Sequence, residues 1–125
     1  MTATLSKQDR LNATLSTLRT AMPELRGVLV ATVDGLPIAQ SMHDGTDANR
    51  VAAMAATAIG LGKRINDTLG GGELTDMSVS GLTGQVYIYS AGSKGVLAVV
   101  VPTGMNLGLL HMEARDTAQS VANIL

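Results

Sequence analysis

The chain has no cysteine, no tryptophan and no phenylalanine, and two tyrosines are its only aromatic residues. Without cysteine it forms neither disulfides nor thiolate metal sites. The formal net charge is −1, so there is no excess of basic residues to attract a phosphate backbone, and aromatic side chains that could stack on bases are scarce. We therefore expect no nucleic-acid partner, and a core built from Val, Leu, Ile, Met and Ala.

Long apolar runs are also missing. No run reaches the roughly 18 apolar residues that a membrane helix requires. The opening residues, MTATLSKQDR, lack the apolar segment of a secretion signal. We expect a cytoplasmic protein with no membrane insertion. A chain of 125 residues has the length of one domain, so residues 1–125 are expected to fold as a single unit.

Residue sets that carry catalysis or bind ligands are not found either. A phosphate-binding loop needs Gly-x-x-x-x-Gly-Lys-Ser/Thr between a strand and a helix, whereas Gly62-Lys63-Arg64 lies inside an expected helix and lacks the hydroxyl residue. Ser41, His43 and Asp44 crowd into one loop, and His43 with Asp44 and Asp47 offers a metal only one imidazole. We expect no catalytic residue, no metal, no cofactor and no enzymatic activity beyond regulation of a partner.

The dominant feature that is present is the stretch 46–69, which reads as one helix that is apolar almost all the way round. Thr46 is its expected N-cap, a carboxylate follows in the first turn, and Gly70 can end it in the left-handed conformation. From 51 to 62 only Thr57 is polar. A surface helix of a monomer should show more polar residues than this.

A rotation of about 100° per residue separates two stripes on this helix. The bulky stripe is expected to cover a sheet and consists of Val51, Met54, Ala55, Ala58, Leu61, Ile65 and Leu69. The flat stripe consists of Ala53, Ala56, Thr57 and Gly60. We expect the flat stripe to contact another copy of the chain or another protein. The alternative is that its alanines are there only because alanine favours helices.

Two amphipathic helices are expected near the ends of the chain. Ser6 is a capping residue for the first, which should end near Met22 because Pro23 disfavours helical geometry in the residue before it. Asn106 is the expected cap of the last helix. His111 is expected on the buried face of that helix, as a hydrogen-bonded core histidine rather than a ligand.

The remaining segments indicate five strands. Continuous apolar runs at 28–33 and 96–101 predict central strands, and Asp34-Gly35 predicts a hairpin into an edge strand over 36–41. Polar and apolar residues alternate over 73–80 and 85–90. We therefore expect an α/β (α+β) fold of order αββαβββα, with a mainly antiparallel sheet in the order 2-1-5-4-3. The third strand then forms an open edge that invites pairing with a second copy.

Three segments in this order resemble one known family. They are the strand 27–30 leading to Asp34-Gly35-Leu36-Pro37-Ile38-Ala39, the alanine-rich helix from Asp47, and the helix start Asn106-Leu107-Gly108-Leu109-Leu110. Together they resemble the Roadblock dynein light chain family over nearly the whole chain. Arg115-Asp116 and the short length are most similar to its bacterial branch, which includes the Roadblock component of actinobacterial conservon operons.

The resemblance implies a Roadblock/profilin-like shape, with one helix on one face of the sheet and two on the other. It also implies a homodimer joined through the third strand, with the middle helices of both copies on one face. Family members of this type bind small Ras-like GTPases; some accelerate GTP hydrolysis and others are scaffolds. By position, we expect partner contacts at Arg50, Ala53, Ala56, Thr57, Gly60 and Arg64, and the dimer strand at Thr75, Met77 and Val79.

The sequence thus predicts a non-catalytic, homodimeric signalling module that binds and regulates, or scaffolds, a small Ras-like GTPase. Arg50 is the best single candidate for a contact, because a cation in the first turn opposes the helix dipole. Lys63 and Arg64, near the opposite end, have either a structural reading as dipole partners or a functional one. The alternative function is a sensor that holds a small apolar ligand between sheet and helix, where some of the seven methionines could line a pocket.

Overall fold

The computed structural model describes residues 5–43 and 45–125. Asp44, considered above as a metal ligand and as a member of the loop group Ser41, His43 and Asp44, lies outside the described residues. The elements in chain order are α1 (Lys7–Ala21), β1 (Gly27–Thr32), β2 (Pro37–Ser41), α2 (Ala48–Leu69), β3 (Asp76–Ser80), β4 (Gly84–Ala91), β5 (Gly95–Pro102) and α3 (Leu107–Ile124).

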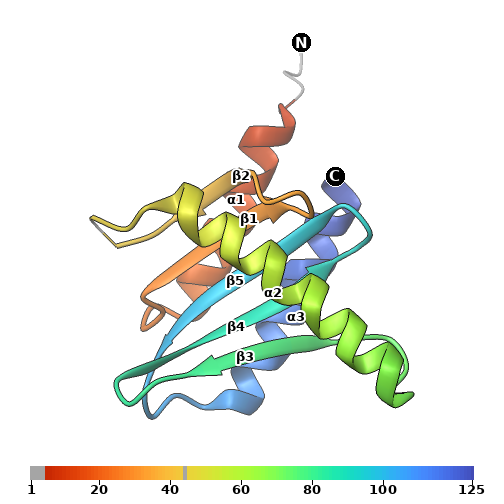
Figure 1. The fold of residues 1–125 in the computed structure, drawn as a ribbon. Helices are drawn as coiled ribbons and strands as arrows, with labels where there is room; N and C mark the ends of the chain where they lie inside the picture. The colour runs from red at the N-terminus through yellow and green to blue at the C-terminus, as the bar shows by residue number, and fades with distance from the viewer. Residues whose placement is uncertain (1–4, 44) are drawn as a thin grey trace.

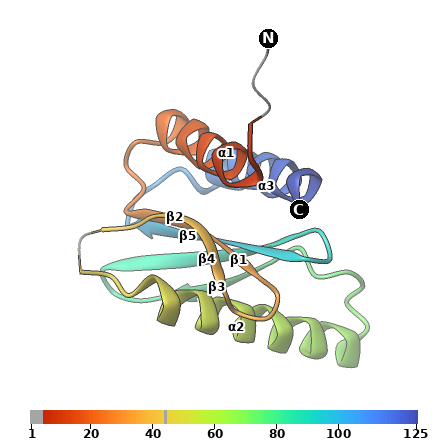
Figure 2. The same cartoon turned by 90° about the horizontal axis from the view of Figure 1, so that it is seen from above.

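The strands form one five-stranded sheet in the order β2-β1-β5-β4-β3, and each described pairing is antiparallel. Helix α2 covers one face, and α1 and α3 lie side by side on the other (Figures 1 and 2). This confirms the predicted element order, strand order and division of the helices. The uninterrupted runs form β1 and β5 in the sheet centre, whereas β2 and β3 are its two edges.

The two faces of the sheet carry cores of different size. The larger core joins α1 and α3 to the sheet through side chains such as Leu15, Leu110 and Tyr89. The core beneath α2 is smaller and contains Ala55 and Ile59. Alternation along the strands divides residues between these cores, because successive side chains point to opposite faces. Helix α2 is therefore held by fewer buried side chains than the pair on the other face.

The helix caps agree with the sequence at two of three starts. Ser6 accepts a hydrogen bond from the backbone N–H of Asp9, and Asn106 accepts one from that of Leu109. At α2 the prediction of Thr46 was wrong, since Asp47 is the N-cap and its carboxylate accepts from the N–H of Arg50 at 3.2 Å. A carboxylate at this position both accepts the bond and complements the helix dipole.

The connection after α2 is tied to the helix end, so β3 begins later than predicted. Gly70 has φ 70 and ends the helix in the left-handed conformation, as expected. The side-chain amide of Asn66 then donates to the carbonyl of Gly72 at 2.8 Å. Residues 70–75 therefore turn at the helix terminus, and the strand starts only at Asp76.

Candidate interaction surface around helix α2 and strand β3

Helix α2 approaches the sheet with its small residues. The side facing the sheet consists of Ala52, Ala55, Ala56, Ile59 and Gly62, all of which are buried. At Gly62, a Cβ atom would lie 2.7 Å from Cγ of Met77 on β3. At Gly60, by contrast, nothing lies within 4 Å of such an atom. The close approach therefore requires glycine at 62 and not at 60.

The prediction that the bulky stripe covers the sheet was wrong for most of its members. Four of its large side chains are exposed: Met54 (58%), Leu61 (53%), Ile65 (49%) and Leu69 (78%). The reason is that the side chains of Met77 and Leu74 pack against the core under α2. Next to these two side chains only a glycine fits on the helix, at position 62, and the four large side chains of the bulky stripe stay exposed.

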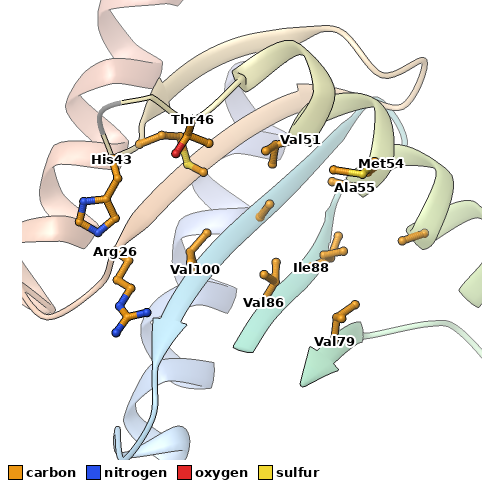
Figure 3. Close-up of a pocket in the computed structure, with 13 residues that line it drawn as sticks. Arg26, His43, Thr46, Val51, Met54, Ala55, Val79, Val86, Ile88 and Val100 are labelled. Carbon is orange, nitrogen blue, oxygen red and sulfur yellow. The ribbon is translucent and has the colours of Figure 1, made fainter. Parts of the chain in front are cut away.

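An apolar cavity of about 420 Å³ lies between α2 and the sheet next to this stripe. Its walls come from α2 and from β3, β4 and β5, and include Met54, Ala58, Val79, Val86 and Val100. Figure 3 shows Arg26 and His43 together at one end and valine side chains across the floor. The cavity opens beside Val79, which is 58% exposed. An exposed apolar stripe therefore continues into an apolar hollow.

Strand β3 presents an open edge beneath the stripe. It pairs with β4 on one side only, from Asp76↔Tyr89 to Ser80↔Gln85. Of the residues expected in a dimer strand, Met77 and Val79 belong to β3, whereas Thr75 precedes it and its hydroxyl donates to the Asp76 carboxylate. Met77 is partly buried under α2 and Val79 lines the cavity. The predicted alternation is thus correct within the strand.

The residues expected to contact a partner lie on more than one side of α2. Arg50, Ala53, Thr57 and Arg64 are exposed and Gly60 is half-buried, so this part of the flat stripe faces away from the sheet. Ala56 is only 8% exposed and lies on the sheet-facing side. Ala53 and Ala56 also receive the β1–β2 hairpin, where a Cβ at Gly35 (φ 94) would lie 3.2 Å from Cα of Ala53.

A cluster of polar groups supports β3 and β4 from the opposite face. The hydroxyl of Tyr89 lies 2.8 Å from Nδ1 of His111, and the ring of Tyr87 meets that of His111 edge-on. Burial raises the pKa of the Tyr89 hydroxyl above its usual range, and the nearby Asp76 carboxylate raises it further. Arg115 of α3 forms a 3.3 Å ion pair with Asp76. These contacts fasten α3 behind the open edge.

His111 was predicted to be a hydrogen-bonded histidine within the core, and the structure agrees on the hydrogen bond but not on the degree of burial. It is half-buried rather than fully enclosed, although it does have the hydrogen-bond partner that was expected. The sequence signal that could have revealed the contact is that both tyrosines are on β4, two residues apart, so that they point to the same face.

Within the described residues no group of three or more His, Cys, Asp or Glu side chains is placed to hold a metal ion. In that same part of the chain, no helix is both long and apolar enough to cross a membrane. The described surface around α2 offers apolar side chains, backbone edge groups and arginines. Such a set suits recognition of protein surfaces rather than bond-making chemistry.

One helix on one face of an antiparallel sheet and two helices on the other are the architecture of Roadblock- and profilin-like domains. The fold of this chain matches the gliding protein MglB from Thermus thermophilus (TM-score 0.83, 16% identity, 99% of this chain and 94% of that one). It also matches a Roadblock/LC7 domain from Streptomyces avermitilis (TM-score 0.82, 24% identity, 90% and 94% covered).

The family follows from the sequence comparisons. The model of the Roadblock/LC7 domain matches residues 11–101. An uncharacterized protein of Methanocaldococcus jannaschii, MJ1340, is 32% identical over 97 residues, which cover 78% of this chain and 84% of that protein. The chain belongs to the Roadblock/LC7 family.

Proposed function

We propose that this protein is a non-catalytic, homodimeric signalling module that binds and regulates, or scaffolds, a small Ras-like GTPase in the cytoplasm. The observation that carries the proposal is the arrangement of side chains on α2. The helix has an exposed apolar stripe beside the β3 edge and an exposed side that contains arginines and faces away from the sheet. The GTPase class comes from the family resemblance, including the resemblance to bacterial conservon components.

The apolar flank supports dimer formation through β3. Helix α2 crosses the sheet obliquely, and its C-terminal end extends past the β3 edge (Figure 1). A twofold axis at this edge would continue the sheet into a second copy, antiparallel and self-complementary. Leu61 and Ile65 of each copy would then lie over the other copy's sheet, where the cavity bordered by Val79 and Val86 is open. The exposed stripe of each copy would then fill the cavity of the other copy.

The outer face of α2 remains exposed in such a dimer and is the proposed GTPase surface. Arg50, Thr57 and Arg64 are spaced by seven residues, so they lie along the solvent side of the helix. Arg115–Asp76 is the ion pair found among the described residues, and neither arginine of α2 takes part in it. Two exposed guanidinium groups on this side of the helix favour an acidic protein surface. Ala56 is not part of this proposed surface, because its side chain is buried.

Binding of a purified small Ras-like GTPase, loaded with GTP or GDP, tests the proposal. Gly60→Arg places a long side chain in open space beside the proposed surface, and we expect it to abolish binding while dimer and fold persist. Gln119→Arg on the exposed side of α3 is the matched control and should bind normally. Equal binding by both variants, with unchanged circular dichroism, would contradict this surface.

The cavity supports a second candidate, a sensor for a small apolar ligand. Its volume of about 420 Å³ is within the range of ligand pockets. The two functions are separated by mass spectrometry of the native protein. A ligand retained through purification in stoichiometric amount favours the sensor, whereas a ligand-free dimer favours filling of the cavity by the second copy.

A further inference from the structure

The second edge of the sheet is unpaired as well. Among the strands of the described residues, β2 pairs with β1 alone, through pairs such as Leu29↔Gln40 and Val30↔Ala39. Its outer side therefore carries backbone N–H and C=O groups with no strand beside them. Pro37, which lacks an N–H, occupies the first position, so the edge left for a partner is Ile38–Ser41. Within it, Ile38 lies at a shift in the register with β1, and the carbonyl of Ser41 already accepts a hydrogen bond from Arg19.

Two neighbouring depressions follow this edge and together are called the groove here. Their volumes are about 490 and 350 Å³, and both are lined by Asn12 and Gln40. One wall is α1, which contributes Gln8, Asn12, Ser16 and Thr20. The other side reaches Ala48 at the start of α2. The groove thus runs along the outer strand with a helix beside it.

The helical wall is mainly polar. Four of its six residues repeat every four positions and are uncharged amides or hydroxyls, which can donate and accept hydrogen bonds, and the other two are Leu15 and Arg19. At one end Arg19 donates from Nη1 to the carbonyl of Ser41 at 2.9 Å. The one ion pair of the described residues lies elsewhere, between Arg115 and Asp76. Arg19 therefore offers further N–H donors to a carboxylate.

We propose that this groove binds an extended peptide segment of another protein, which adds to β2 as an outer strand and places a carboxylate at Arg19. Backbone pairing with Ile38–Ser41 would supply affinity, and the polar wall of α1 would position alternate side chains. The site lies on the edge opposite β3, so it does not depend on the dimer or the GTPase surface.

A peptide fits this edge better than a second copy does. The free edge is four residues long, begins after a proline, and contains the shift in the β1–β2 register between Val30 and Ala31, which falls at Ile38. Such features restrict sheet-to-sheet association between copies. The mainly polar wall also lacks the apolar centre that permanent homodimers bury. Transient capture of a short segment requires neither.

Selection from a display library of random nine-residue peptides against the full chain tests the proposal. Selected peptides should be bound about tenfold more weakly by Asn12→Arg, because its long side chain fills the groove where the depressions meet. Ala13→Arg is the matched control: it adds the same charge one position away, on an exposed residue that lines neither depression. Peptide binding should also slow amide exchange at Ile38–Ser41.

Two further arms examine the chemistry. N-methylation of alternate peptide residues on the pairing side should abolish binding, and Arg19→Gln should weaken carboxylate-bearing peptides but not their amide counterparts. Comparison of free and amidated C-termini, and of Asp and Asn, identifies the carboxylate source. Failure to select any peptide, equal binding by Asn12→Arg and Ala13→Arg, or tolerance of N-methylation would overturn the proposal and leave the proposed dimer and GTPase surface untouched.

Discussion

The two edges of the sheet are open in the same geometric sense but are surrounded by different side chains. Beside β3, the exposed apolar stripe of α2 leads into an apolar cavity. Beside β2, a mainly polar face of α1 that includes Arg19 borders a groove. Permanent homodimer interfaces are apolar at their centre, whereas transient ones are more polar. Under the two proposals, the flanking helix, rather than the strand, therefore sets the kind of partner expected at each edge.

The largest expected effect is on dimerisation. In the proposed dimer, Val79→Asp places a carboxylate between the sheets of the two copies and the apolar stripe of α2. An unpaired buried charge costs about 3 kcal/mol or more, so we expect the dimer dissociation constant to rise by about 100-fold or more. Sedimentation velocity measures this change. Val79 is preferred to Met77, because Met77 also packs under α2.

The matched control for this prediction lies on the other edge. Gln40→Asp introduces the same side chain on β2, at an exposed position, and should leave the dimer unchanged. Equal dissociation caused by the two substitutions, or none caused by either, would remove the distinction between the edges.

The next effect concerns how closely α2 approaches the sheet. Gly62→Ala should destabilise the fold by about 1–3 kcal/mol, because its methyl group overpacks against Met77. Gly60→Ala should stabilise it by up to about 1 kcal/mol, since alanine favours helices and the site is open. Urea unfolding of both variants gives the two free energies. The same sign for both would show that the helix is not seated as described.

The support behind β3 predicts a dependence on pH. Because burial raises the pKa of Tyr89, the folded state keeps its hydroxyl proton where the unfolded chain has lost it. The stability is complete below the unfolded pKa of about 10 and decreases as the pH rises above it. Tyr89→Phe should flatten this alkaline decrease and cost about 1 kcal/mol near neutral pH. Urea unfolding between neutral and alkaline pH measures both, and an unchanged alkaline decrease in Tyr89→Phe would refute the assignment.

The smallest effect is expected at the ion pair between α3 and β3. Arg115 is largely exposed, so Arg115→Ala should change the free energy of unfolding by less than about 1 kcal/mol. Asp116→Ala, on the same turn but outside this pair, serves as its comparison. A loss well above that of Asp116→Ala, and above 1 kcal/mol, would mean that the pair is a principal support of the β3 edge.

The sequence predicted the fold well because each local signal agreed with the topology. The runs that form β1 and β5 lack polar alternation, Pro37 marks one edge, and the half-polar pattern of β3 marks the other. The residues proposed for partner binding and the dimer strand remain predictions, with Ala56 found buried and Thr75 found outside the strand.

The orientation of α2 could not be predicted from the helix alone. Apolar residues surround most of the helix, so periodicity does not say which side faces the sheet. The buried side matches neither predicted stripe, since it includes Ala52, Ile59 and Gly62. The answer depends on Met77 and Leu74, distant in sequence, which occupy the space under the helix. The groove beside β2 was also beyond the sequence, because it requires α1 and β2 to lie next to one another. Local patterns identify elements, but contacts between distant elements decide which faces remain exposed.

The most direct test of the central claim is amide hydrogen exchange of the native chain at a series of concentrations. We predict that residues 76–80 of β3 are protected at high concentration and lose that protection on dilution as the dimer dissociates, while residues 38–41 of β2 exchange at a rate independent of concentration. Exchange in β3 that does not change with dilution, or a change confined to β2, would contradict the account.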